Sequence, residues 1–165
     1  EFARPESNQQ PLRLETVVLD DVVRDVLATF RAKLQQLGFE IDVTLNTPEK
    51  RRLDPGAVEQ ILVNLIGNAE KYAAEGGRLE IRTEGFGNQV AIEVQDFGPG
   101  IPSRYALQIF EPFMRISDRL EDPAGTGIGL TIARDLARKH GGDCTLVDSQ
   151  VGARFRCQLT AEAIG

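Results

Sequence analysis

The spacing of apolar residues along the chain predicts three helices. In residues 19–38 the apolar positions follow a helical period, and a glycine closes the segment. A second helix is expected to begin at Pro55 and to end near Tyr72, where "AAEGG" follows. The third covers "IGLTIARDLARKH", residues 128–140, and a shorter apolar helix is expected around residues 105–110.

Apolar and polar residues alternate in further segments, as they do in half-buried strands. These segments are 39–45, 78–85, 89–96, 143–149 and 153–159. "FGN" between the second and the third predicts a hairpin turn, and the last two predict a second hairpin. Because hairpin strands are antiparallel and helices are interleaved with them, the pattern predicts a two-layer α/β sandwich. Its sheet would be mixed, mainly antiparallel and covered by helices on one face.

The composition is that of one ordinary globular domain. The chain has 165 residues, of which 41% are hydrophobic and 27% charged, and its net charge is -6. This acidic balance argues against a nucleic-acid-binding surface, which needs a basic patch. No apolar run approaches the roughly 20 residues of a membrane span. Because the net charge is negative, an anionic ligand would have to be held by local groups rather than by the overall field.

The cysteines and the histidine offer little chemistry by themselves. Cys144 and Cys157 are the only two cysteines, and we interpret them as free cytosolic thiols, with a position on adjacent strands of one hairpin left open. His140 is the single histidine and ends the third helix before two glycines. We interpret it as a cation at the negative helix end rather than as a catalytic or phosphoacceptor group.

Polar residues form an unusual stripe on the second helix. Gln60, Asn64, Asn68 and Lys71 recur about one turn apart, opposite the leucines, although asparagine is a poor helix former. Buried amides could fasten the helix to a neighbouring loop. Two amides beside a lysine fit Mg²⁺ and phosphate better, because an amide oxygen is a metal ligand that adds no negative charge.

Two glycine-rich segments follow, each with a structural alternative. "DFGPGI", residues 96–101, is a turn capped by Asp96 or a close approach of backbone to a flat ligand that Asp96 hydrogen-bonds. "GTGIGL", residues 125–130, has two interpretations. It is either a glycine-rich loop that only leads into a helix, or a helix N-terminus whose amides bind phosphate. It matches neither the P-loop nor the dinucleotide-binding pattern.

The order and spacing of four segments resemble the catalytic, ATP-binding domain of sensor histidine kinases. The wider superfamily includes DNA gyrase, the MutL repair proteins and ninety-kilodalton heat-shock chaperones. "NLIGNAEKY" is similar to the N box, "DFGPGI" to the G1 box, "IFEPF" to the F box and "GTGIGL" to the G2 box. The resemblance covers about 19–159 and implies a Bergerat-type ATP-binding fold. Residues 16–165 would form this domain, and residues 1–15 a linker or the remnant of an upstream helical hairpin.

The resemblance also implies roles for individual residues. Asn68 would be the Mg²⁺ ligand, Asn64 would lie near the γ-phosphate and Lys71 would contact phosphate, with Asn64 and Lys71 as the catalytic residues. Tyr72 would pack beside the adenine or ribose, and Asp96 would accept the adenine amino group. The other expected ATP-binding residues are Gly98, Gly100, Ile101, Arg115, Gly125, Thr126, Gly127, Ile128, Gly129 and Leu130.

A nucleotide lid is implied as well. It would span 114–124, with Phe110 and Phe113 anchoring its root. One residue departs from the family pattern, because Ala153 stands where a hydroxyl residue usually follows the glycine of the last hairpin. A minor polar contact is therefore not expected here.

The implied activity is transfer of the γ-phosphate of Mg-ATP to a histidine on a separate dimerisation and phosphoacceptor hairpin. The implied partners are that hairpin, in a homodimeric full-length kinase, and a downstream response regulator, with no nucleic acid and no membrane contact by this domain. The domain would be cytoplasmic, and the resemblance leaves open whether the parent protein is anchored in the inner membrane.

Other members of the superfamily supply the alternatives. These are an ATP hydrolase that works as a clamp, an anti-sigma-type serine kinase, and a scaffold without activity. Asn64 argues against the first two, because such enzymes usually have a glutamate there as general base, and an amide cannot take a proton. A neutral histidine is already a usable nucleophile, so a histidine kinase needs no strong base.

Overall fold

The computed structural model describes residues 11–112 and 129–164. Seven strands and three α-helices make up this part of the chain. The strands are β1 (Glu15–Val18), β2 (Glu40–Thr44), β3 (Lys50–Leu53), β4 (Arg78–Phe86), β5 (Gln89–Asp96), β6 (Asp143–Val147) and β7 (Arg154–Thr160). The helices are α1 (Leu19–Gln36), α2 (Pro55–Tyr72) and α3 (Gly129–Lys139).

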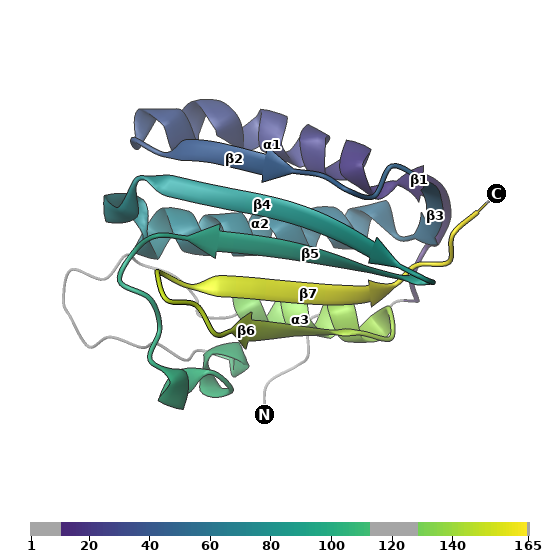
Figure 1. Cartoon of the computed structure of the whole chain (residues 1–165). Coiled ribbons are helices and arrows are strands. Elements are labelled where there is room, and N and C mark those ends of the chain that lie inside the picture. The colour runs from purple at the N-terminus through teal and green to yellow at the C-terminus, as the bar shows by residue number, and fades with distance from the viewer. Residues whose placement is uncertain (1–10, 113–128, 165) are drawn as a thin grey trace.

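The predicted sandwich is confirmed. Five strands form one sheet in the order β2-β4-β5-β7-β6, and the three helices lie together on one face of it (Figure 1). β2 and β4 are parallel, whereas the other neighbours in the sheet are antiparallel. The parallel pair arises because the chain crosses over through α2 between β2 and β4. The sheet is thus mixed and mainly antiparallel, as expected.

The core fills the space between the sheet and the helices. Alternate residues of β5 and β7 point into it, and one stripe of each helix faces it. The largest fully buried side chains are Phe155, Leu19, Leu34, Leu53, Ile61, Leu62, Leu65, Ile66, Leu79, Ile81, Ile92 and Leu159. The other face of the sheet carries charged side chains such as Glu80 and Glu93, and no helix of the described residues covers it (Figure 1).

Two short strands were not predicted. β1 and β3 pair antiparallel beside the main sheet, with Glu15 opposite Leu53 and Val18 opposite Lys50. β3 reads "KRRL", which lacks the alternation of a half-buried strand. Its pairing depends on β1, and that long-range contact has no local signal.

The prediction of one apolar helix around residues 105–110 is wrong. The segment forms two separate one-turn 3₁₀ helices, Ser103–Tyr105 and Gln108–Phe110. Leu107 between them is 75% exposed, whereas Ile109 and Phe110 are buried. So few buried residues cannot offset the cost of nucleating an α-helix, and short tight turns result.

The interpretation of the cysteines as free thiols is also wrong. Cys144 on β6 and Cys157 on β7 stand directly opposite each other in the strand register and form a disulfide. Both residues are fully buried. The hairpin register decides the pairing, because it brings the two Cα atoms to 4.1 Å from each other.

Candidate nucleotide-binding site

Helix α2 presents the polar stripe that the sequence singled out. The helix begins with Pro55 after Asp54, whose side chain accepts a hydrogen bond from the Ala57 amide at 3.2 Å. Its buried residues are Ala57, Val58, Ile61, Leu62, Leu65, Ile66 and Ala69. The core therefore fixes the rotation of the helix and leaves the asparagine stripe partly exposed.

Asn64 has a buried donor without a partner. Its Nδ2 atom is buried and makes no hydrogen bond to any residue that the structure describes. Its Oδ1 atom would lie 3.5 Å from a Cβ atom built on Gly129, the first residue of α3. Unpartnered buried donors are rare and call for an explanation. A phosphate oxygen at the N-terminus of α3 would satisfy this amide, so the residues present fit a phosphate group.

Asn68 and Lys71 continue the stripe toward the end of α2. Asn68 is half-buried and Lys71 exposed, and within the described ranges neither side chain makes a hydrogen bond or ion pair. The same ranges contain no cluster of three or more His, Cys, Asp or Glu residues that could hold a metal. A Mg²⁺ ion here would thus rely on an amide oxygen together with phosphate oxygens and water, a set that Mg²⁺ accepts.

Asp96 ends β5 on the helix-covered side of the sheet. It is only 6% exposed, and its Oδ1 atom accepts hydrogen bonds from the Gly98 amide at 3.1 Å and the Ala153 amide at 3.0 Å. Burial raises the pKa of Asp96 above its ordinary value, although both amides oppose the rise. Of the donors in the described residues, none reaches Oδ2, which is left to accept from a ligand.

The glycines after Asp96 serve close packing. A Cβ atom on Gly98 would lie 2.8 Å from Ala73, just beyond α2, and 3.5 Å from the Tyr72 carbonyl. Gly100 has a positive φ of 79°. The Asp96 side chain caps this turn through Oδ1, as the structural alternative for "DFGPGI" predicts, while the ligand-binding alternative, which concerns Oδ2, stays a prediction. The same turn brings Tyr72, which is 42% exposed, beside the loop that starts at Asp96.

The remaining predicted residues fall into two groups. Gly129 and Leu130 form the first turn of α3, and Ile101 is half-buried after the Asp96 turn. The predicted Arg115, Gly125, Thr126, Gly127 and Ile128, the lid 114–124 and its anchor Phe113 lie outside the described residues. Phe110, the other predicted anchor, is 4% exposed.

The backbone contact between Asp96 and the turn that joins β6 to β7 is a part of the site that sequence reasoning missed. Gly152 has a φ of 65°, and a Cβ atom there would lie 2.0 Å from the Asp96 carbonyl oxygen. Ala153 lacks the hydroxyl of the family pattern, but its backbone amide holds the Asp96 carboxylate. No local signal could reveal this contact, because it joins residues 57 positions apart.

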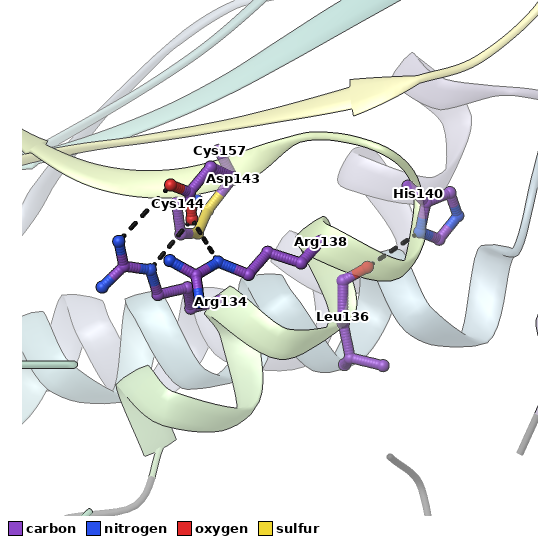
Figure 2. The surroundings of a disulfide bond; sticks show 7 residues. All are labelled: Arg134, Leu136, Arg138, His140, Asp143, Cys144 and Cys157. Atoms are coloured by element: carbon purple, nitrogen blue, oxygen red, sulfur yellow. Dashed lines mark hydrogen bonds and ion pairs between the residues drawn. A yellow bond between two sulfur atoms is a disulfide. The ribbon is translucent and has the colours of Figure 1, made fainter. Parts of the chain in front are cut away.

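His140 has the structural role expected of it, but not as a cation. It is 4% exposed, and the Asp54 amide donates to Nε2 at 3.2 Å. Because Nε2 accepts, Nδ1 carries the proton and donates to the Leu136 carbonyl at 3.0 Å (Figure 2). The neutral ring therefore joins the end of α3 to the start of α2.

The described helices include none long and apolar enough to cross a membrane.

Comparison with known proteins identifies the family. The model described as histidine kinase-, DNA gyrase B- and HSP90-like ATPase matches residues 53–163. The alginate biosynthesis sensor protein KinB of Pseudomonas aeruginosa is 30% identical over 158 residues, which cover 93% of this chain and 26% of KinB. This chain thus spans about a quarter of that relative.

Solved structures agree with this match. Full-length ShkA in complex with AMPPNP has a TM-score of 0.83 at 26% identity, covering 94% of this chain and 33% of ShkA. A nucleotide-free catalytic domain of the histidine kinase ThkA has a TM-score of 0.80 at 26% identity, covering 90% of this chain and 96% of the ThkA chain. The chain belongs to the family of histidine kinase-, DNA gyrase B- and HSP90-like ATPases, as a homologue of the catalytic domains of sensor histidine kinases.

Proposed function

We propose that this domain binds Mg-ATP and donates the γ-phosphate to a histidine on a separate helical hairpin of the full-length kinase. The observation that carries the proposal is the buried, unpartnered Nδ2 of Asn64 beside the first residue of α3. The free Oδ2 of Asp96 supports it, because a carboxylate oxygen can accept from the amino group of adenine.

In this proposal each residue has a separate task. The base binds to Asp96 and to the turn that follows it, which contains Gly98, Gly100 and Ile101. Tyr72 packs beside the base or ribose. Asn64 donates to the γ-phosphate, Lys71 neutralises phosphate charge, and Asn68 holds the metal. The further phosphate-binding residues would be Arg115, Gly125, Thr126, Gly127, Ile128, Gly129 and Leu130. Bound Mg²⁺ would draw negative charge from the β- and γ-phosphates.

The transfer needs no base on this domain. The ring nitrogen of the acceptor histidine attacks the γ-phosphorus, the bond to the bridging oxygen breaks, and ADP leaves with the electron pair. The Asn64 amide cannot deprotonate water, which favours transfer over hydrolysis by a clamp-type ATPase or over a serine kinase. The division into residues 1–15 and 16–165, the homodimer, the response regulator and the cytoplasmic location stay predictions.

The test combines binding with transfer. Calorimetry should give binding of ATP and ADP but not GTP, because the guanine carbonyl would oppose the Asp96 carboxylate. With radiolabelled ATP and the isolated hairpin, label should appear on an acid-labile phosphohistidine. His140→Ala should leave this transfer largely intact. Equal affinity for ATP and GTP would contradict the assignment of Asp96 to the adenine base. Rapid ATP hydrolysis without transfer to the hairpin would favour the clamp-type ATPase.

A further inference from the structure

Phe110 is fastened to α3 and the sheet by three contacts. Its carbonyl oxygen accepts a hydrogen bond from Thr131 Oγ1 at 2.6 Å, in the first turns of α3. The Arg134 guanidinium carbon lies 4.9 Å from the centre of its ring. The ring also meets Phe155 of β7 edge-on, with 6.2 Å between ring centres. Phe110 is 4% exposed, so these contacts form in a dry environment that strengthens them.

Arg134 joins this residue to the edge of the sheet. Its Nε donates to Asp143 Oδ1 at 2.9 Å and its Nη2 donates to Oδ2 at 3.4 Å (Figure 2). The Arg134 side chain is 19% exposed. Burial alone would raise the pKa of Asp143, but hydrogen bonds from Arg134, the Cys144 amide and Arg138 outweigh it and lower the pKa. One guanidinium group thus spans the first residue of β6 and the Phe110 ring.

The end of α3 that these contacts fix is the end that faces the polar stripe of α2. Thr131 lies two residues after Gly129. A Cβ atom built on Gly129 would lie 3.5 Å from Asn64 Oδ1, so this end of α3 is next to Asn64. A shift of this end of α3 would change the space beside the unpartnered Asn64 amide. Polar groups that bind phosphate must be held within a fraction of an ångström, so their support matters.

We propose that Arg134 is a positioning residue for the nucleotide site. Without touching nucleotide, it holds Phe110 and Asp143 together and thereby sets the N-terminal end of α3 against Asn64. The inference rests on the proposed function, since the site it supports is the proposed Mg-ATP site.

Arg138 provides a matched control. It donates from Nε to the same Asp143 Oδ1 atom at 3.1 Å, one turn further along α3. Its side chain is 54% exposed, and of the aromatic rings in the described residues none is stacked under it. Replacing either arginine by methionine removes its ion pair to Asp143 and keeps a long side chain, although Arg134→Met removes two hydrogen bonds to Asp143 and Arg138→Met removes one. Only Arg134→Met also removes the group over Phe110.

The experiment measures Mg-ATP affinity and structure in the same variants. Arg134→Met should weaken Mg-ATP binding by about three- to tenfold, a typical size for coupling through packed residues, and Arg138→Met by less than about twofold. In nucleotide-free protein, Arg134→Met should move the NMR signals of the Asn64 side-chain amide and the Gly129 amide, and Arg138→Met should leave them in place. Arg134→Lys keeps the charge and should recover part of the affinity.

Several outcomes would overturn the inference. Equal losses of affinity in Arg134→Met and Arg138→Met would show that only the Asp143 ion pair matters. Unmoved signals of Asn64 and Gly129 would show that Arg134 does not set that end of α3. If Arg134→Met fails to fold, Arg134→Lys and Arg138→Lys carry the same comparison, because lysine keeps the charge and only Arg134→Lys removes a planar group from over Phe110. A wild-type domain that binds no nucleotide overturns the proposed function itself, which separates the two failures.

Discussion

Glu93 and Asp96 lie on the same strand, β5, but on opposite faces of the sheet. Glu93 faces the open side, where Arg154 and Arg156 each approach one of its oxygens at 2.7 Å. Asp96 faces the helices and receives two backbone amides on one oxygen. Burial acts to raise the pKa of both. The two arginines lower the pKa of Glu93 below its ordinary value, whereas at Asp96 only backbone amides, and no cation among the described residues, oppose the rise.

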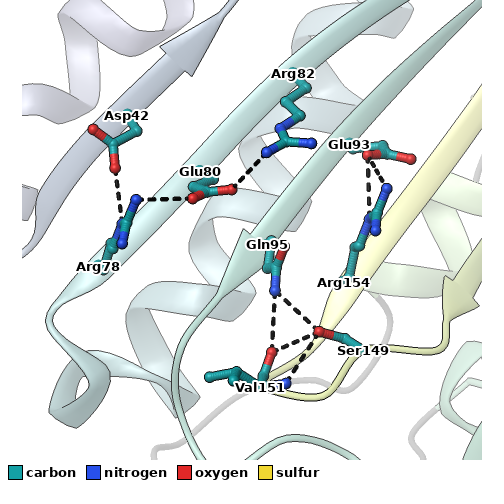
Figure 3. A network of polar contacts seen from close by, with 9 residues as sticks. All are labelled: Asp42, Arg78, Glu80, Arg82, Glu93, Gln95, Ser149, Val151 and Arg154. Atoms are coloured by element: carbon teal, nitrogen blue, oxygen red, sulfur yellow. Dashed lines mark hydrogen bonds and ion pairs between the residues drawn. The ribbon is translucent and has the colours of Figure 1, made fainter.

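The same contrast extends over both regions. On the open face, Arg78 bridges Asp42 and Glu80, and Arg82 approaches the other oxygen of Glu80 (Figure 3). On the helix side, the described residues give Asn68 and Lys71 no partner, and the Asn64 amide nitrogen is buried without one.

The two regions thus differ in whether their polar side chains have partners within the protein. Groups with such partners are structural, and groups without them are available to bind a ligand. A charged group whose partners lie within the protein adds to the stability of the fold and offers little to a ligand. A buried group without a partner destabilises the free protein unless a ligand satisfies it. We therefore expect substitutions on the open face to change stability, and substitutions on the helix side to change nucleotide affinity.

Asp96→Asn should have the largest effect. The amide oxygen can still accept from Gly98 and Ala153, but the amide nitrogen would oppose the amino group of adenine. Affinity for ATP should fall by about 100-fold or more. Stability at pH 7 should not fall, because an uncharged side chain replaces a buried carboxylate. Calorimetry and urea unfolding measure the two quantities, and retained ATP binding would remove Asp96 from the site.

Asn68→Ala should come next. Loss of one ligand to Mg²⁺ should weaken Mg-ATP binding on the order of ten- to 100-fold, with little change in ATP binding when magnesium is absent. Gln60→Ala is the control, because Gln60 is exposed on the same helix two turns earlier. Equal losses in both variants would mean that the stripe acts only through the helix.

Much of this architecture could be predicted from the sequence because its signals are local. Asp54 and Pro55 mark the start of α2, and "AAEGG" after Tyr72 marks its end, so the predicted helix from Pro55 to near Tyr72 agrees with the observed one. The hairpin of β4 and β5 follows from alternation on both sides of Gly87, which has a φ of 61°. Asn64 and Asn68 stand out in the sequence because asparagine is a poor helix former.

The unpredicted parts depend on contacts between distant segments. The support of Asp96 by Ala153 and the pairing of β1 with β3 arise only once the chain has folded. The disulfide required the register of β6 and β7, in which Cys144 faces Cys157. The neutral state of His140 depends on the Asp54 amide, which lies 86 positions away.

Glu93→Gln should leave nucleotide affinity within about twofold of wild type while lowering the free energy of unfolding by about 1–3 kcal/mol. The variant keeps the shape of the side chain but removes the charge that Arg154 and Arg156 share. Calorimetry with ATP and urea unfolding at pH 7 measure the two effects. A loss of affinity comparable with that of Asp96→Asn would end the distinction between the two regions.

The smallest expected effect is a difference in the pH dependence of stability. The folded protein holds the Asp96 proton at a pH where the unfolded chain, with its ordinary value of 3.8, has released it. The contribution of Asp96 to stability should therefore grow as the pH falls through its raised pKa. Glu93 behaves oppositely, because its contribution is present above its ordinary value of 4.5 and is lost as the pH falls through its lowered pKa.

Two variants isolate these contributions, because asparagine and glutamine do not titrate. The stability difference between wild type and Asp96→Asn should shift in favour of wild type as the pH is lowered from 7 to about 4. The difference between wild type and Glu93→Gln should shrink as the pH is lowered below about 4.5. Urea unfolding in a series of buffers without nucleotide measures both. Slopes of the same sign would mean that the two carboxylates are held alike, and that position on one face or the other of β5 does not decide their chemistry.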